Sequence, residues 1–203
     1  MTKFSYLTVT HATEGLYKEK GSRFLSFCFP VANQEDIKVN LEKLRKKYYD
    51  ARHHCYAWML GSELTEYRAN DDGEPNHSAG DPILGQIKSK GLTNVLIVVV
   101  RYFGGTKLGV GGLINAYRTA AEDALSKVEV IKKDLTEPVT IHYDYDQTAD
   151  ILRLVKEFDL PILSQDFGEQ CTLCTEVKSA VRLRFSERVQ LLKDTGINFS
   201  VNI

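Results

Sequence analysis

The first third of the chain alternates short runs of aromatic and β-branched residues with a one-sided apolar stripe. Residues 5–10 and 23–31 have the composition of strands, and Gly21 lies near the turn between them. Asn33 is a typical N-cap residue, and Asp36 follows three residues later in a capping-box arrangement. Apolar positions after Asn33 recur at helical spacing, so the pattern predicts two strands and then a helix.

The middle of the chain contains its most continuous apolar run. Residues 54–60 predict a strand, and Asp81, followed by a proline, predicts a helix start for which Gly91 is a natural end. Residues 94–102 are apolar at almost every position, which predicts a central strand covered on both faces. After a glycine-rich stretch, residues 113–125 show the amphipathic pattern of a helix.

A domain boundary is predicted at Thr136-Glu137-Pro138, where the charge balance changes and a proline interrupts the pattern. Residues 1–136 carry 19 Lys and Arg against 16 Asp and Glu, a net +3, whereas residues 137–203 carry 7 against 11, a net −4. The second part predicts strand 139–145, helix 147–158, strand 161–167, strand 170–177, helix 180–194 and strand 197–203. This βαββαβ order is typical of a ferredoxin-like fold, so we expect an α+β protein with domains 1–136 and 137–203.

The composition is that of an ordinary globular protein, with 43% hydrophobic and 26% charged residues among 203. The longest apolar run, residues 95–100, suits one buried strand and is far too short for a membrane span. The N-terminus lacks the pattern of a signal peptide, and four cysteines without such a signal are typical of reduced thiols. These features predict a cytoplasmic protein without membrane contact, and no cofactor is predicted.

The strongest local signal lies between the predicted central strand and the next helix, where five glycines follow Arg101 and Tyr102: Gly104, Gly105, Gly109, Gly111 and Gly112. Backbone N–H groups of such a loop can approach an anion closely, and the helix N-terminus adds free donors. Arg101 and Lys107 would supply positive charge. The run has neither a Walker A ending nor a dinucleotide fingerprint. Two interpretations of the glycine run therefore stay equally open. The loop is an anion site, or it needs glycine only for its conformation.

Residues 50–58, which lead into the strand predicted at residues 54–60, combine basic side chains with a thiol. Alternation along a strand places Arg52 and His54 on one face, and His53 and Cys55 on the other. His53 and Cys55 could be two ligands of a metal, or His53 could act as the base for a Cys55 nucleophile. A small buried thiol is the commoner case. His53 and His54 are therefore weak catalytic candidates.

The polar turn over residues 70–80 concentrates carboxylates. Asp71, Asp72 and Glu74 could hold Mg²⁺, which prefers oxygen ligands, and Asp72 and Glu74 are also weak catalytic candidates. Asp-Gly and Glu-Pro pairs are equally the ordinary chemistry of a tight surface turn, and this second interpretation is favoured. Ser78, in the same turn, is a candidate ligand-binding residue.

Cys171 and Cys174 have the spacing of a redox or zinc pair. In the predicted strand, residues three apart point to opposite faces, which separates the two sulfur atoms. No second Cys or His pair lies nearby to complete a tetrahedral site, so neither function is predicted.

Four stretches, in this order and spacing, resemble the IMPACT/YigZ family: Lys20-Gly-Ser-Arg-Phe24, Asp50-Ala-Arg-His-His-Cys55, Asp71-Asp-Gly-Glu-Pro75 with Ser78-Ala-Gly80, and the run from Val99 to Leu113. The resemblance implies a first domain of the ribosomal protein S5 domain-2-like type and a second domain similar to domain V of elongation factor G. Eukaryotic members with an added N-terminal domain restrain a translation-controlling kinase. This chain begins almost directly at the shared domain, so the resemblance implies only the broader role in translation of short bacterial-type members.

Three functions are expected from these features. A binding protein would contact the ribosome, RNA or a translation-related protein through the first domain, with phosphates held by Arg23, Arg52, Arg101, Lys107 and Arg118 and bases stacked on Tyr102 and Phe103. An enzyme would act on a small phosphorylated substrate through Gly104–Gly112, with the weak metal and catalytic candidates named above. A protein–protein adaptor would use the same motifs as a docking face.

Overall fold

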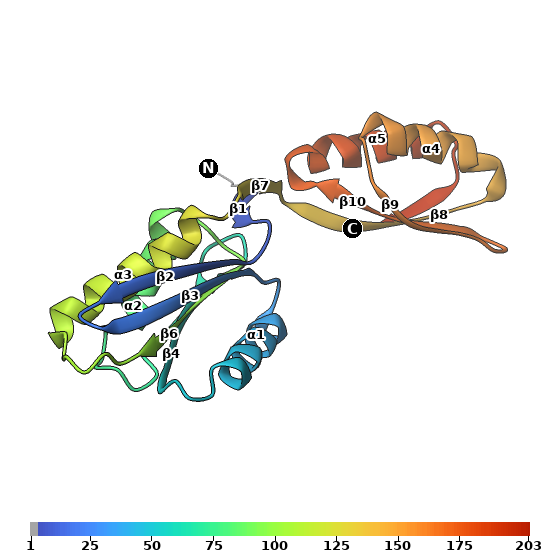
Figure 1. Ribbon diagram of the computed structural model, residues 1–203. Helices are drawn as coiled ribbons and strands as arrows, with labels where there is room; N and C mark the ends of the chain where they lie inside the picture. Colours follow the sequence, from blue (N-terminus) through green and yellow to red (C-terminus); the bar gives the residue numbers. More distant parts are fainter. Residues whose placement is uncertain (1–3) are drawn as a thin grey trace. The chain divides into compact units, whose positions relative to one another are not determined.

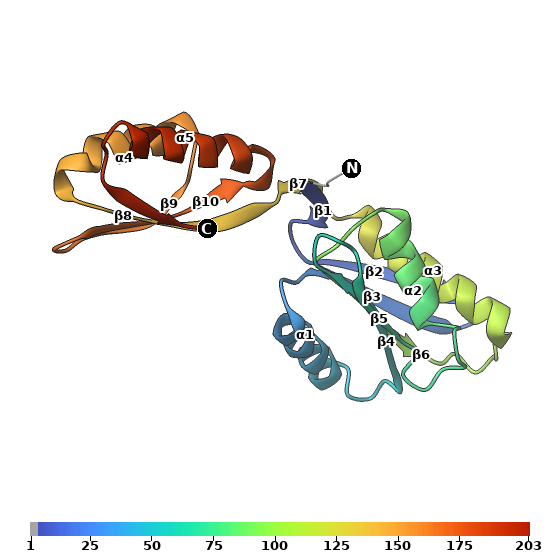
Figure 2. The ribbon, with the colours of Figure 1, turned by 180° about the vertical axis from the view of Figure 1, so that it is seen from behind.

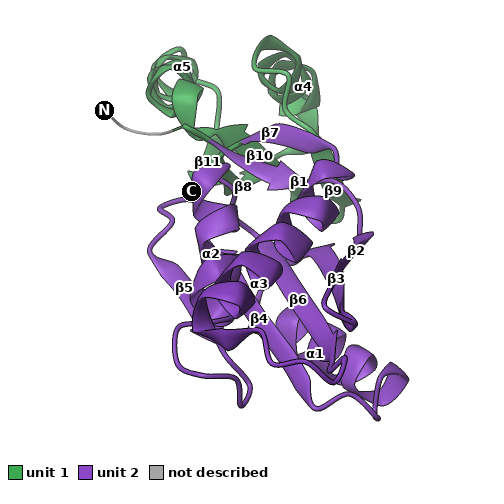
Figure 3. Cartoon of the chain, turned by 60° about the vertical axis from the view of Figure 1, so that its left-hand side comes forward, with its two compact units in different colours: residues 1–5, 134–203 green, residues 6–133 purple. Residues whose placement is uncertain are grey.

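The computed structural model describes residues 4–203, which form two compact units (Figure 3). Residues 6–133 make up the first unit, drawn in purple, and residues 134–203 with Phe4 and Ser5 belong to the second, drawn in green. Each unit has a hydrophobic core of its own. Within residues 4–203, no helix is both long and apolar enough to cross a membrane.

An antiparallel five-stranded sheet forms the centre of the first unit, in the order β2-β3-β6-β4-β5. Its strands are β2 (Thr13–Glu19), β3 (Ser22–Pro30), β4 (His53–Leu60), β5 (Glu66–Asn70) and β6 (Val95–Tyr102). The helices of this unit are α1 (Gln34–Lys47), α2 (Gly80–Ser89) and α3 (Gly109–Ser126). Two short strands, β1 (Ser5–Val9) and β7 (Val130–Asp134), pair with each other outside the main sheet.

Helices cover both faces of this sheet, as Figures 1 and 2 show from opposite sides. The apolar stripe of α1 packs on one face, whereas α2 and α3 pack together on the other. Strand β6 is therefore buried from Val95 to Arg101, which confirms the prediction of a central strand covered on both faces. The predicted alternation along β4 is also confirmed, because Cys55 lies in the α2/α3 core and Tyr56 in the α1 core.

The predicted cap of α1 is confirmed, whereas the predicted cap of α2 is wrong. Asn33 Oδ1 accepts a hydrogen bond of 2.9 Å from the backbone N–H three residues later. Helix α2 begins at Gly80, before Asp81, and the N–H groups of Ala79 and Gly80 both donate to Asp71 Oδ1, at 2.9 and 2.8 Å. A carboxylate from the preceding turn thus satisfies the free donors of this helix start.

The sequence does not predict β2 and β5, and both are edge strands of the sheet. Strands β2 and β3 form a hairpin, and Gly21 lies in its turn with φ +79°, a conformation that favours glycine. The turn therefore connects β2 to β3, and not the strands predicted at residues 5–10 and 23–31. Edge strands expose much of their surface, so polar side chains hide the apolar period that marks a strand.

The second unit has the predicted βαββαβ order: β8 (Thr136–Tyr143), α4 (Thr148–Glu157), β9 (Ile162–Phe167), β10 (Cys171–Lys178), α5 (Arg182–Asp194) and β11 (Phe199–Asn202), with single helical turns η1 (Tyr145–Gln147) and η2 (Ser179–Val181). The strands form an antiparallel sheet in the order β11-β8-β10-β9. Pro138 does not interrupt the secondary structure at the predicted boundary, because it lies inside β8, opposite Glu176. Cys171 is buried in β10 while Cys174, facing the other way, is half-buried, as the alternation predicts.

Candidate functional site

A buried ion pair lies where the central strand ends. Arg101, in β6, is opposite Phe24 in β3 and His53 in β4. Its Nη1 donates a hydrogen bond of 2.6 Å to Glu74 Oε1, and the two side chains are only 8% and 4% exposed. The hydroxyl of Tyr117, in α3, donates to the same oxygen at 2.7 Å. A sheet strand, a turn and a helix are thus tied together at one carboxylate.

Cys55 lies beneath this ion pair and has the surroundings of a structural thiol. Its Sγ lies 3.0 Å from the carbonyl oxygen of Asp71 and 3.3 Å from the hydroxyl of Tyr117, and can donate to either. Burial raises the pKa of the Cys55 thiol, and burial likewise raises the pKa of Tyr117. A nucleophilic cysteine needs an accessible thiolate, so this geometry does not support the Cys55 nucleophile hypothesis.

The three carboxylates of the turn bind different partners. Asp71 accepts the N–H groups of Ala79 and Gly80 at one oxygen and that of His77 at the other. Burial alone would raise the pKa of Asp71, but these backbone donors lower it below its ordinary value.

Asp72 Oδ2 accepts from the backbone N–H of His54 at 2.7 Å, and Glu74 is held in the ion pair. Across residues 4–203, no group of three His, Cys, Asp or Glu side chains is placed to hold a metal. The weak metal candidates are accounted for by the turn itself.

The two histidines face opposite sides of the sheet. His53 is half-buried, and its Nδ1 lies 2.9 Å from the carbonyl oxygen of Asp72. His54 is buried; burial lowers its pKa, while the charge of Asp72 opposes the shift. The structure therefore places His53 beside Arg101 and keeps His54 away from it.

Exposed groups surround the buried ion pair. The ring of Phe103 is 59% exposed and lies over the Arg101 guanidinium, 5.7 Å from ring centroid to Cζ. Two cavities share Arg101 and Phe103: one of about 380 Å³ includes Arg52 and His53 in its lining, and the other, of about 370 Å³, includes Glu74, Lys107 and Gly109. We call Arg52, His53, Arg101, Phe103 and Lys107 the Arg101 site.

Arg23 and Tyr102 form a smaller group next to the Arg101 site. The Arg23 guanidinium lies over the Tyr102 ring at 5.1 Å. The Tyr102 hydroxyl donates a hydrogen bond of 2.7 Å to Asp50, and this bond, followed by burial, raises the pKa of Tyr102 to about 12. Both Tyr102 and Asp50 line the larger cavity, so the ring is part of the same surface.

The glycines of the loop differ in what they do. A Cβ on Gly104 would overlap the backbone of Gly21 and Ser22, so this glycine allows the loop to touch the β2–β3 turn. Gly105 and Gly109 have φ of +87° and +72°, and this left-handed conformation alone explains why glycine occupies both positions. A Cβ on Gly112 would lie 3.0 Å from the Cβ of Leu108, which is a tight contact.

Gly111 differs from these four residues. A Cβ on Gly111 would meet nothing within 4 Å, and its φ does not lie in the left-handed region. It is also exposed, in the first turn of α3. The folded unit therefore gives no reason for glycine at this position.

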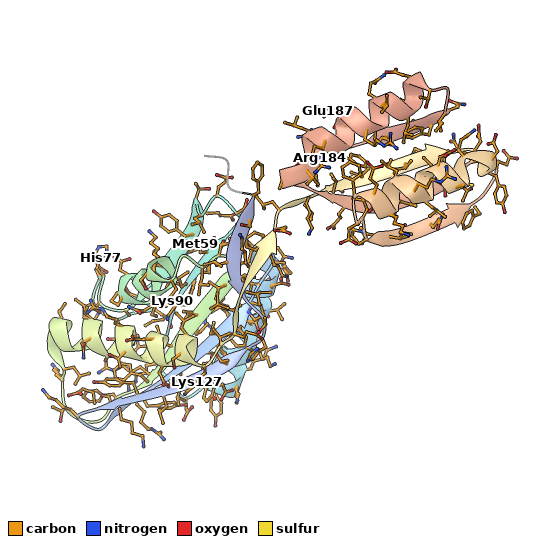
Figure 4. The ribbon with its side chains drawn as sticks, turned by 90° about the horizontal axis from the view of Figure 1, so that it is seen from above. Met59, His77, Lys90, Lys127, Arg184 and Glu187 are labelled. Atoms are coloured by element: carbon orange, nitrogen blue, oxygen red, sulfur yellow. The ribbon has the colours of Figure 1, made fainter. Side chains whose placement is uncertain are left out.

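Two candidates lie elsewhere. The hydroxyl of Ser78 is buried and donates to the carbonyl oxygen of Pro75 at 2.6 Å, inside the turn. Arg118 lines a separate surface hollow between α2 and α3, together with His77, which projects outward from the turn before α2 (Figure 4). Sequence reasoning missed the role of Tyr117, because its position fits the apolar stripe of α3; the only signal was a hydroxyl within that stripe.

The first unit, which carries these residues, matches a known protein family. The family model of the Impact N-terminal domain matches residues 20–125, which include the whole Arg101 site. The chain belongs to the IMPACT family. It is 32% identical to the IMPACT family member YvyE of Bacillus subtilis over 90% of this chain and 84% of that protein, and 33% identical to YigZ of Escherichia coli over 84% of each.

A solved structure described as a hypothetical protein has the same overall fold. Its TM-score is 0.75 at 30% identity, over 98% of this chain and 97% of that one. The likeness therefore extends through both units of this IMPACT-family chain.

Proposed function

We propose that this IMPACT-family chain is a binding protein that takes single-stranded RNA at the Arg101 site. The observation that carries the proposal is the exposed ring of Phe103, which stands between two cavities with Arg52 on one side and Lys107 on the other. An exposed ring flanked by cations is the combination by which proteins hold a base and its neighbouring phosphates.

Arg101 itself is not the main source of positive charge for a ligand. Its guanidinium is neutralised by Glu74 and contacts the rings of Phe24 and Phe103, at 5.4 and 5.7 Å from their centroids. Its role in this proposal is to hold Phe103 and the turn in place. Arg52, Lys107 and the nearby Arg23 are exposed and supply the charge that would meet phosphates.

The partner follows from the family and from the charge of each part. The family resemblance implies a role in translation, so ribosomal RNA or a translation factor bound to RNA is the partner that we propose. The net +3 of residues 1–136 against the net −4 of residues 137–203 favours the first part as the binding part. We also propose the two fold names given by the resemblance; the β11-β8-β10-β9 order supports the ferredoxin-like one.

The test is the salt-dependent affinity for a labelled single-stranded RNA, followed by fluorescence anisotropy. Phe103→Ala should weaken binding by roughly 1–3 kcal/mol, the value of one stacked base. Lys107→Ala and Arg52→Ala should each reduce the slope of log K against log salt by about 0.7, the effect of one phosphate contact on a single strand. Lys90→Ala, an exposed lysine at the end of α2, is the matched control (Figure 4). No binding at low salt would rule the proposal out.

A second candidate is an enzyme acting on a small phosphorylated substrate through Gly104–Gly112. The observation that favours it is the cavity of about 370 Å³ at the start of α3, a size that suits a small ligand. Screening phosphorylated compounds for thermal stabilisation tests it, because a ligand at a hundred times its Kd adds roughly 2.7 kcal/mol. Stabilisation by a small phosphate compound without RNA binding would favour the enzyme over the binding protein.

A further inference from the structure

A groove on the α1 side of the first unit lies on the opposite face of the sheet from the core beneath Arg101. It has a volume of about 220 Å³ and lies between α1 and the β4–β5 edge. Trp58 and Tyr56, each 8% exposed, are part of its lining on β4. Arg68 is the cross-strand partner of Trp58, so both side chains lie on this face. The groove therefore has an aromatic floor and a polar rim.

The rim of this groove is predominantly basic. Lys38, Arg45 and Arg68 line it against a single carboxylate, Glu42, and all four are exposed. Arg45 is 3.5 Å from Asp72 in an ion pair that is partly open to solvent. An aromatic side chain flanked by carboxylates would complement both the aromatic floor and the basic rim.

The chain itself carries a segment of this kind. Tyr145 lies in η1, is 77% exposed and stands between Asp144 and Asp146, both exposed. Two hydrogen bonds close the turn: the backbone N–H of Gln147 donates to the Asp144 carbonyl oxygen at 2.9 Å, and the Gln147 side chain accepts the N–H of Asp144 at 3.2 Å. A large ring presented on a fixed turn between two carboxylates has a low entropic cost of docking.

We propose that the α1 groove binds the Asp144–Tyr145–Asp146 turn of a second copy of this chain. The Tyr145 ring occupies the groove against Trp58, and the two carboxylates face the cations of the rim. The excess of positive charge in residues 1–136 and of negative charge in residues 137–203 favours the same pairing. Because groove and turn are different surfaces, the contact is heterologous, and copies can extend into a ring or an open chain. A contact this small gives a weak, reversible association.

Trp58 makes the proposal directly measurable, because it is the chain's only tryptophan and lies in the groove. Trp58 emission and weight-average mass are followed together on dilution of the full chain, at low and high salt. The mass is expected to rise with concentration and to fall with added salt, with a parallel change in Trp58 emission. Tyr145→Ala should weaken the association by roughly tenfold or more, the loss of a buried aromatic anchor. Tyr49→Ala, which removes a ring that is 85% exposed outside the groove, should change neither signal.

Mixing two variants tests directly whether the groove of one copy binds the turn of another. Tyr145→Ala keeps the groove and loses the turn, whereas a Lys38→Glu, Arg68→Glu double variant keeps the turn and loses the groove. At concentrations at which the wild-type chain associates, each variant alone should be largely monomeric, and the mixture should form a dimer that cannot extend further. The double variant Lys43→Glu, Lys46→Glu, on exposed α1 positions outside the groove lining, is the control for added charge.

Three results would overturn the proposal. The first is a wild-type chain that stays monomeric at all concentrations with constant Trp58 emission. The second is self-association that persists in Tyr145→Ala at the wild-type strength. The third is a difference in Trp58 emission between wild type and Tyr145→Ala that does not depend on concentration, which would place the turn in the groove of the same chain.

Discussion

Replacing Glu74 by alanine removes the acceptor on which the buried centre of the first unit depends. Glu74 Oε1 receives Arg101 Nη1 at 2.6 Å and the Tyr117 hydroxyl at 2.7 Å, and its side chain is only 4% exposed. In the variant the Arg101 charge stays buried without its counter-charge. Removing one partner of such a pair costs about 3–5 kcal/mol, because desolvation of the remaining charge is no longer offset.

A double-mutant cycle separates the ion pair from simple loss of packing. Arg101→Leu alone leaves Glu74 charged and buried, and should cost about the same 3–5 kcal/mol. The double variant Glu74→Ala, Arg101→Leu contains neither buried charge, so its loss should be well below the sum of the two single losses. The expected coupling energy lies at the upper end of the roughly 0.5–3 kcal/mol seen for residues in contact.

Urea unfolding followed by Trp58 fluorescence is the appropriate assay, because Trp58 is the only tryptophan and reports on the first unit alone. With a slope of about 2 kcal/mol/M, a loss of about 4 kcal/mol lowers the midpoint by about 2 M. Glu14→Ala is the matched control: Glu14 pairs with Lys47 at 4.0 Å and is 69% exposed, so its loss should be small compared with that of Glu74→Ala. A midpoint for Glu74→Ala as close to wild type as that of Glu14→Ala would refute the reasoning, as would additivity of the two single variants.

The remaining predictions concern thiols, glycines and pH. In the folded protein a thiol reagent should label half-buried Cys174 first, and buried Cys55 only after unfolding. Peptide mass spectrometry of the labelled chain measures the order, and early labelling of Cys55 would contradict its burial and raised pKa. Urea unfolding should show that Gly104→Ala destabilises the first unit by roughly 1–3 kcal/mol, because the added Cβ overlaps the β2–β3 turn. In the same assay, Gly111→Ala should be neutral or stabilising by up to about 1 kcal/mol. Because the pKa of His54 is lowered in the folded state, the unfolded state binds the proton first as the pH falls, near the ordinary pKa of about 6.5. The stability contributed by neutral His54 is therefore present above that pH and is lost below it. His54→Gln should flatten the fall in urea midpoint between about pH 7.5 and 5.5.

Local pattern was sufficient for the elements whose apolar period is strong. Strand β6 is buried along nearly its whole length, and α3 keeps one apolar stripe from Leu113 to Leu125, so both are evident in the sequence. Strands β2 and β5 are edge strands with polar side chains on their exposed surfaces, and their period was too weak to predict them. The start of α2 was mispredicted for a different reason: its donors are satisfied by Asp71, eight and nine residues away in the chain.

The candidate site was predictable as a set of residues, while their arrangement required the three-dimensional structure. Pattern alone placed Arg101, Lys107 and the glycines at the end of a buried strand, and alternation separated His53 from His54. It could not reveal that Glu74 meets Arg101, because the two are 27 residues apart. The acidic turn left a metal site open beside the favoured surface turn for the same reason, because the backbone donors that occupy Asp71 are evident only in the folded structure.

Most of the residues that draw attention in the sequence are used by the fold itself. Asp71 caps α2, Glu74 and Arg101 neutralise each other, and Gly104 permits contact with the β2–β3 turn. A residue with such a role is explained without any ligand. Phe103 and Gly111 are different, because the Phe103 ring is 59% exposed and Gly111 has room for a side chain. If Gly111→Ala raises the free energy of unfolding and yet weakens RNA binding, the glycine serves close approach of the ligand backbone to the start of α3, and the Arg101 site extends onto that helix.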